Sequence, residues 1–198
     1  MSKDQKSWIN PCGFENDMTD NCTQDKSSLD GIDRELEISL NKMKSLRESV
    51  KKAYPTVDWE SLESLKYSFL ELPEFNKNDT WANVYRMLQI TAMTIEELQK
   101  SKIMSKNDDE EYFEKLTVVR ASIQQLLCKV NIILKSNCVT YNDAYETEML
   151  PEFIKGRKMA ERHFIAIRQM ITVFDKLLKL FAPEKYKSIK VNQLNGHV

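Results

Sequence analysis

The sequence predicts an all-helical protein, an up-up-down-down four-helix bundle with two long crossover loops. Only 4 Gly and 5 Pro occur in 198 residues, too few for the tight turns that a sheet protein needs. Apolar residues recur at steps of three and four along four long stretches, which is the period of a helix. The connections between these stretches are long, short and long, at about 25, 6 and 15 residues, as in bundles with crossover loops.

The first helix is expected from about Ser28 to Ala53, after an N-terminal arm, residues 1–27, that has no hydrophobic period. Ser27 or Ser28 can cap its start. Pro55 ends it, because the residue before proline is pushed out of helical geometry. Seven apolar residues make its buried stripe: Leu29, Ile32, Leu36, Leu40, Met43, Leu46 and Val50.

The connection 55–80 is too apolar to be a solvated linker. We expect it to pack over the bundle, with one short helix near Trp59–Leu70. Its apolar residues are Trp59, Leu62, Leu65, Tyr67, Phe69, Leu70, Leu72 and Phe75.

The second helix should begin at Asn78 or Thr80 and run to about Ser101, followed by the short turn 102–107. Because this turn is short, the second and third helices must form an antiparallel hairpin. The expected inner face of the second helix is Trp81, Val84, Leu88, Thr91, Ile95 and Leu98.

The third helix lies in the stretch Glu110–Cys138 and persists to about Lys135, about seven turns. Asn107 and Glu110 offer a capping box at its start, and the acidic cluster Asp108–Glu111 suits the positive end of a helix. Its stripe is continuous, so we expect it to lie against other helices along most of its length. The stripe contains Phe113, Leu116, Val119, Ile123, Leu126, Leu127, Val130, Ile133 and Leu134.

The last helix is expected from about Lys155 to Ala182, after a second long connection, residues 139–152. Pro183 stops it and leaves a loose tail, residues 183–198, so the bundle domain covers residues 28–182. Its inward residues are Met159, Phe164, Ile167, Met170, Ile171, Phe174, Leu177, Leu178 and Phe181.

Four cysteines, Cys12, Cys22, Cys128 and Cys138, favour one topology. The last two are separated by a helical rise of about 10 Å plus a turn, too far for a bond between them. Disulfides would then join the arm to the end of the third helix. The start of the first helix and the end of the third must therefore share one end of the bundle, as in up-up-down-down order. Which arm cysteine pairs with which partner stays open.

Composition excludes several classes of function. A net charge of −1 gives no reason to expect a nucleic-acid partner, and no run is apolar enough to enter a membrane. The N-terminus is too polar for a signal peptide, so either a leader has been removed or the protein leaves the cell without one. We expect a secreted monomer with two disulfides. The sequons at Asn21 and Asn78 suggest glycosylation. Four free thiols in a cytosolic protein are the alternative.

The sequence carries no catalytic signature, and we expect no enzyme activity, no cofactor and no metal. His163 is interpreted as a helix-surface histidine rather than a general base. The acidic cluster at the start of the third helix is interpreted as a cap rather than a metal site. The aromatic residues of the first connection could line a ligand pocket, but packing over the bundle is the simpler interpretation.

Several short motifs resemble one family. They are the two cysteines before the first helix, Leu72-Pro73-Glu74-Phe75 ahead of the segment 78–86, the segment 123–130 with Cys128, and the segment 152–159. They are similar to the leukaemia inhibitory factor/oncostatin M branch of the interleukin-6 family of long-chain helical cytokines. The resemblance implies a secreted ligand that clusters single-pass receptors of the glycoprotein-130 type and starts JAK–STAT signalling.

The resemblance also implies particular residues. It implies the nested disulfides Cys22–Cys128 and Cys12–Cys138. It implies a receptor motif at the start of the last helix, carried here by Phe153, Lys155, Arg157 and Lys158, although Gly156 stands where the family has lysine. The chain lacks the family's extra disulfide between the first long loop and the last helix.

The function predicted from the sequence is therefore that of a helical cytokine that acts by binding. One receptor chain would contact exposed faces of the first and third helices, and another would contact the start of the last helix. The candidate residues on the first and third helices are Arg34, Glu37, Lys44, Arg120 and Gln124. The rivals are an intracellular helical adaptor and an all-helical enzyme or ligand carrier.

Overall fold

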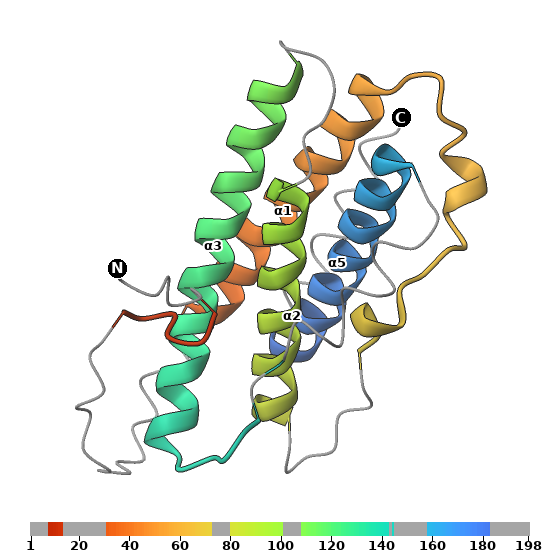
Figure 1. The fold of residues 1–198 in the computed structure, drawn as a ribbon. Helices are drawn as coiled ribbons and strands as arrows, with labels where there is room; N and C mark the ends of the chain where they lie inside the picture. Colours follow the sequence, from red (N-terminus) through yellow and green to blue (C-terminus); the bar gives the residue numbers. More distant parts are fainter. Residues whose placement is uncertain are drawn as a thin grey trace, which may run out of the picture.

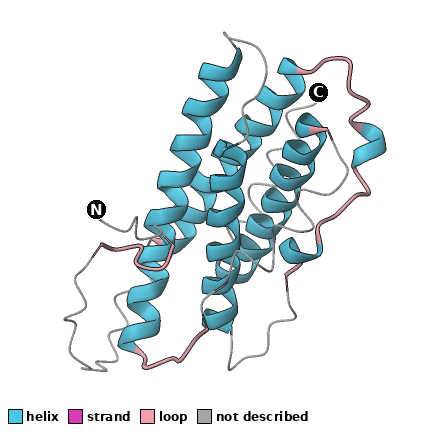
Figure 2. Cartoon of the chain, in the orientation of Figure 1, coloured by secondary structure: helices cyan, strands magenta, loops and turns pink. Residues whose placement is uncertain are grey.

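The computed structural model describes residues 8–13, 31–72, 80–100, 108–142, 144 and 158–182. The described residues form helices and loops, and none of them forms a strand (Figure 2). The elements in chain order are α1 (Ile32–Ala53), the 3-10 turns η2 (Glu60–Leu62) and η3 (Ser68–Leu70), α2 (Thr80–Lys100), α3 (Asp108–Ser136) and α5 (Met159–Phe181). The predicted all-α four-helix bundle is confirmed.

Helix α1 begins later than the sequence suggests. Its N-cap is Gly31, whose φ of 86° lies in the left-handed region, and no side chain caps the helix. A residue in this conformation breaks the helical path, so the helix cannot extend back to Ser28, and the expected serine cap is wrong. The glycine is suited to the position because it has no Cβ to clash there. The predicted stripe from Ile32 to Val50 is buried as expected.

Helix α5 also begins later, at Met159 instead of Lys155. Lys158 precedes it in an extended conformation, with a ψ of 149°, and ends the helical run on that side. The inward residues named from the sequence are buried, apart from Met159 and Phe181, which are half-buried.

Helix α2 is more deeply enclosed than its predicted inner face implies. Every residue from Met87 to Ile95 is buried, so this stretch is covered on all sides. The extra cover comes in part from outside the bundle, because Gln89 hydrogen-bonds to the backbone of Trp8 in the arm and of Ala144 in the second connection. Helical periodicity identifies only the side of a helix that faces other helices. The sequence therefore did not predict that the arm and the second connection also cover α2.

Contacts between helices show their directions. In each case a residue in the first half of one helix meets a residue in the second half of its neighbour. These contacts are Glu35–Lys129 and Ser49–Lys115 between α1 and α3, Glu96–Arg120 and Gln99–Thr117 between α2 and α3, Lys51–Phe164 between α1 and α5, and Trp81–Phe181 between α2 and α5. Helices α1 and α2 therefore run one way, and α3 and α5 run the other (Figure 1). The long connections are described only in part, so two crossover loops stay a prediction.

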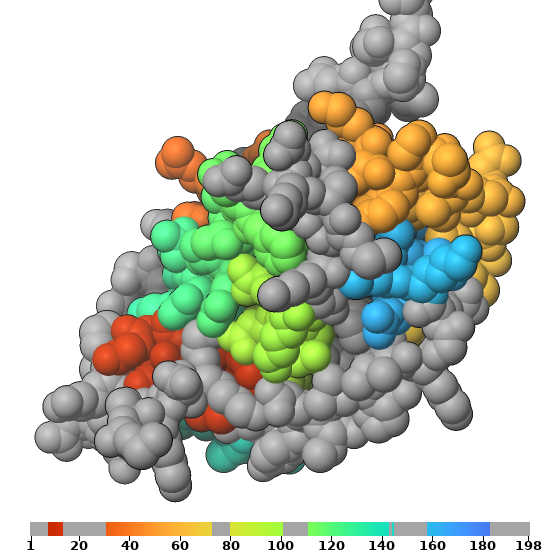
Figure 3. All heavy atoms as spheres, turned by 45° about the horizontal axis from the view of Figure 1, so that its top comes forward, coloured from red at the N-terminus to blue at the C-terminus, as the bar shows by residue number. Residues whose placement is uncertain are grey.

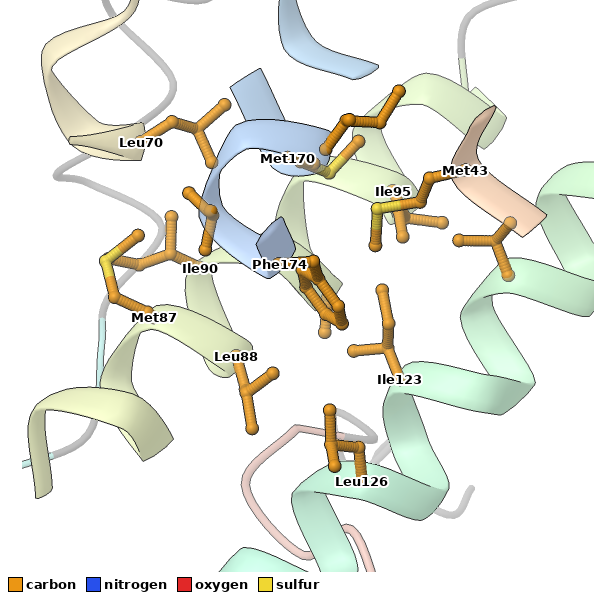
Figure 4. Close-up of a cluster of buried hydrophobic side chains, with 14 of the residues drawn as sticks. Met43, Leu70, Met87, Leu88, Ile90, Ile95, Ile123, Leu126, Met170 and Phe174 are labelled. Carbon is orange, nitrogen blue, oxygen red and sulfur yellow. The ribbon is translucent and has the colours of Figure 1, made fainter. Parts of the chain in front are cut away.

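All four helices contribute to one hydrophobic core. Met43 of α1, Ile95 of α2, Ile123 of α3 and Phe174 of α5 are all fully buried, and their side chains converge on the bundle interior (Figure 4). This burial is the main source of stability, because each large apolar side chain contributes about 1.5–3 kcal/mol when it leaves water. None of the helices in the described residues is long and apolar enough to cross a membrane.

The first connection packs over the bundle, as predicted, but through two 3-10 turns rather than one short helix. Two neighbouring residues of α5 hold its backbone. Gln169 accepts a hydrogen bond from the Tyr67 N–H at 2.6 Å and donates one to the Tyr67 carbonyl at 3.0 Å. Arg168 donates to the carbonyl of Leu65. Because α5 satisfies these backbone groups, the segment does not need regular helical bonds of its own.

Candidate functional site

A disulfide ties the N-terminal arm to the third helix. Cys12 is bonded to Cys128, with their Cα atoms 4.8 Å apart. This confirms the prediction that the arm is linked to α3, but the pairing of Cys22 with Cys128 that the resemblance implied is wrong. Cys138 is disulfide-bonded too. Cys22 lies outside the described residues.

The N-terminal arm also packs against α2 and α3. Trp8 is only 2% exposed and belongs to the core, and its carbonyl accepts a hydrogen bond from Gln89 of α2 at 3.1 Å. The carbonyl of Pro11 accepts one from Gln124 of α3 at 3.5 Å. Figure 3 shows this segment, in red, lying against α2 and α3. These contacts bring Cys12 to Cys128, which explains the pairing. Trp8 belongs to no hydrophobic period, so the sequence did not identify it as a core residue.

Helix α3 presents four uncharged side chains to solvent along one side. Val118 and Ile132 are 48% and 36% exposed, large values for apolar residues, and Ala121 and Gln125 between them are exposed as well. Steps of three, four and seven residues keep all four on one side of the helix, where the same spacing also places the exposed Glu114 and the half-buried Lys129. We call these four residues the α3 outer face.

Helix α1 borders this face. Ser39 and Ser122 share a buried hydrogen bond of 2.8 Å across the two helices, and Lys129 pairs with Glu35 at 3.3 Å. The α1 residues spaced three or four positions from these contacts, Ile38 and Lys42, are half-buried at the border. The helices are therefore joined along a seam, and the α3 outer face rests on a rigid support.

The five receptor candidates on α1 and α3 do not lie on one face. Glu37 and Lys44 lie fourteen and seven residues before Lys51, which lies over the ring of Phe164, so they follow the α5 side of α1. Arg34 is exposed on α1.

The two candidates on α3 are held within the molecule. Arg120 forms an ion pair of 2.8 Å with Glu96 of α2, and Gln124 contacts the arm. Both lie on the α2 side of α3, away from its outer face. The sequence could not assign these sides, because periodicity separates inside from outside but does not tell which neighbour covers each flank.

At the start of the last helix, the structure describes one of the four motif residues. Lys158 is exposed in its extended N-cap conformation. Phe153, Lys155 and Arg157 lie outside the described residues, as do the sequon residues Asn21 and Asn78. Their roles stay predictions.

His163 is a core residue rather than the surface histidine expected. It is fully buried on α5, and its Nδ1 lies 2.8 Å from the hydroxyl of Tyr112 on α3. Burial lowers the pKa of the imidazole to about 3, so the ring is uncharged at neutral pH. The same burial raises the pKa of Tyr112. Position 163 lies four residues before Ile167 and seven before Met170, on the apolar stripe, and this spacing could have revealed it.

The described residues do not assemble a metal centre. Their His, Cys, Asp and Glu side chains form no group of three that could hold an ion. What the described surface offers instead is an exposed apolar helix face on a rigid bundle, which is suited to binding another protein.

Comparison with known proteins assigns the family. No curated protein and no solved structure matches the chain. A family model described as the Unpaired protein matches residues 1–187, nearly the whole length. The chain therefore belongs to the Unpaired protein family.

Proposed function

We propose that this protein is a secreted helical cytokine that binds and clusters single-pass cell-surface receptors and thereby starts JAK–STAT signalling. The observation that carries the proposal is the α3 outer face, a set of four exposed, uncharged residues on one side of a four-helix bundle. The resemblance of the sequence to the interleukin-6 family of cytokines supports the same conclusion.

The composition of the α3 outer face fits a protein partner. The centres of protein interfaces are depleted of charge, while their rims are polar. Val118 and Ile132 supply apolar area, and Lys42 of α1 and Lys129 of α3 lie at the border between the two helices. The two apolar residues are separated by a rise of about 21 Å along the helix, which suits an interface of standard size. The seam with α1 limits the cost of ordering this surface on binding.

Clustering requires a second contact on the same molecule. We assign it to the start of the last helix, where Phe153, Lys155, Arg157 and Lys158 combine one aromatic residue with basic side chains. Aromatic and arginine residues are enriched among those that dominate binding energy. The exposed Lys158 at the N-cap of α5 supports an accessible surface there.

Secretion is supported by the bonded cysteines. Disulfides persist in oxidising compartments and are rare in the cytosol. Cys12–Cys128 and the bonded Cys138 fit that pattern, and an intracellular adaptor would contain reduced thiols instead. Glycosylation at Asn21 and Asn78 belongs to the same proposal.

The test is a signalling assay with purified protein on cells from its own source organism, read as STAT phosphorylation. The variant Val118→Glu/Ile132→Glu places two charges on the α3 outer face. We expect it to lose at least a hundredfold in potency, because each buried unpaired charge costs several kcal/mol at an interface. Leu180→Glu is the matched control, since Leu180 is similarly exposed, at 43%, but lies on α5.

All variants should melt like wild type, because the substituted residues are exposed. Full potency of the double variant would refute the assignment of this face. A wild-type protein that triggers no STAT phosphorylation while it binds a cytosolic partner would favour the adaptor.

A further inference from the structure

A pocket of about 300 Å³ lies between the first connection and α5. The residues that matter here are Lys66, Leu70 and Glu71 of the connection and Arg168, Val173 and Lys176 of α5. The pocket is apart from the α3 outer face, because α3 contributes no lining residue.

The charge of the pocket is positive. Three basic side chains line it against a single acidic one, Glu71. Glu71 is 3.9 Å from Lys66 and both side chains are largely exposed, so this ion pair is weak. Lys66 can therefore turn its ammonium group towards a ligand, and Lys176 is exposed at the rim.

Arg168 provides a positioned charge within the pocket. Its side chain is only 14% exposed and donates to the carbonyl of Leu65, which restrains the guanidinium. Its Nε atom is buried, makes no hydrogen bond among the described residues, and lies 3.7 Å from a carboxylate oxygen of Glu63. Burial lowers the pKa of Arg168, while the carboxylate of Glu63 acts in the opposite direction.

The walls of the pocket are held in place. The two hydrogen bonds between Gln169 and the backbone of Tyr67 fix the connection to α5. Leu70 and Val173 add buried apolar surface beside the charges. A site whose walls are already in place loses little entropy on binding.

We propose that this pocket binds one anionic group, either a carboxylate or a tetrahedral oxyanion such as phosphate. The guanidinium of Arg168 meets the anion inside the pocket, and Lys66 and Lys176 close over it from the rim. Guanidinium groups bind both kinds of anion well, and ammonium groups act as point charges towards either. The site does not depend on the proposed receptor function.

Titration of the full-length, isotope-labelled protein with acetate, phosphate and sulfate, at constant ionic strength set by chloride, tests the proposal. Nuclear magnetic resonance should show saturable shifts at the Arg168 Nε–H and at the backbone amides of residues 70–72 and 172–176. Tighter binding of acetate indicates an acidic side chain as the natural ligand. Tighter binding of phosphate or sulfate indicates a free oxyanion.

The double variant Lys66→Gln/Lys176→Gln should lower the affinity for the preferred anion by about tenfold, because it removes two positive charges and leaves the fold intact. Lys179→Gln is the matched control, because Lys179 is exposed on the same helix but does not line the pocket. Shifts that do not saturate, or an equal loss in the control, would overturn the proposal in favour of diffuse surface attraction.

Discussion

Removal of the Cys12–Cys128 disulfide tests whether this bond holds the N-terminal arm against the bundle. The change is Cys12→Ser/Cys128→Ser, which removes both thiols and so avoids mispairing. The bond spans 116 residues and holds in place the segment that carries the buried Trp8. We expect a less stable protein whose arm leaves the bundle more easily.

The size of the loss depends on the other bond. In the chain-entropy model, a lone crosslink across 116 residues contributes about 5 kcal/mol. Cys138 is bonded as well, and we predict that its partner is Cys22, the remaining cysteine of the sequence. With that second bond intact, the loop reopened by the variant contains only about 20 residues, so the expected loss is about 3 kcal/mol.

Urea unfolding, followed by circular dichroism, measures this loss, and tryptophan fluorescence reports exposure of Trp8 at urea concentrations below the main transition. Cys12→Ala/Cys128→Ala controls for burial of the new hydroxyl groups and should lose the same amount. A loss below about 1 kcal/mol would refute the reasoning, because the arm would then be held by its packing alone. A loss near 5 kcal/mol would mean that the second bond does not restrain the same ends.

Four further predictions follow from particular residues. Peptide mapping without reductant should join Cys22 to Cys138, and a fragment with any other partner for Cys138 would contradict the crossed pairing. The free energy of unfolding should fall by about 2 kcal/mol from pH 7 to pH 5. The reason is that His163 takes up a proton near its usual pKa of 6.5 in the unfolded chain but only near pH 3 in the folded protein. In urea titrations, His163→Gln should make the free energy of unfolding depend less on pH over this range. Phe174→Ala should destabilise the bundle by about 4 kcal/mol, since it empties the centre of the core, whereas the exposed Val118→Ala should stay within about 0.5 kcal/mol by the same assay. Phe153→Ala should weaken receptor binding by about 2 kcal/mol with little change in melting temperature; loss of stability with intact binding would show that the ring packs on the last helix instead.

Hydrophobic periodicity predicted the four helices and most of their buried faces. Positions such as Leu36, Ile123 and Phe174 follow the helical repeat, and each is buried. The ends of the helices were harder to predict from the sequence, because each end depends on the backbone conformation of a single residue. The left-handed φ of Gly31 and the extended Lys158 set the starts of α1 and α5, and neither changes the apolar repeat.

The candidate site was predicted less well, for a related reason. The repeat distinguishes inward from outward residues but does not say which neighbour covers an outward flank. Arg120 was named as a receptor residue, yet its ion pair with Glu96 places it between α3 and α2. Val118 and Ile132 look like ordinary apolar helix residues in the sequence, and only the packed bundle shows how much of each stays exposed, 48% and 36%.

The sequence by itself determined the helical class, the core positions and the link between the arm and the third helix, because these follow from local periodicity and from the reach of a short chain segment. Only the tertiary structure decided the partner of Cys128, the burial of Trp8 and His163, and the side of the bundle on which each polar residue lies. These features depend on contacts between segments far apart in the chain, such as Trp8 with Gln89 and Tyr112 with His163. Their geometry arises only once the helices pack against one another.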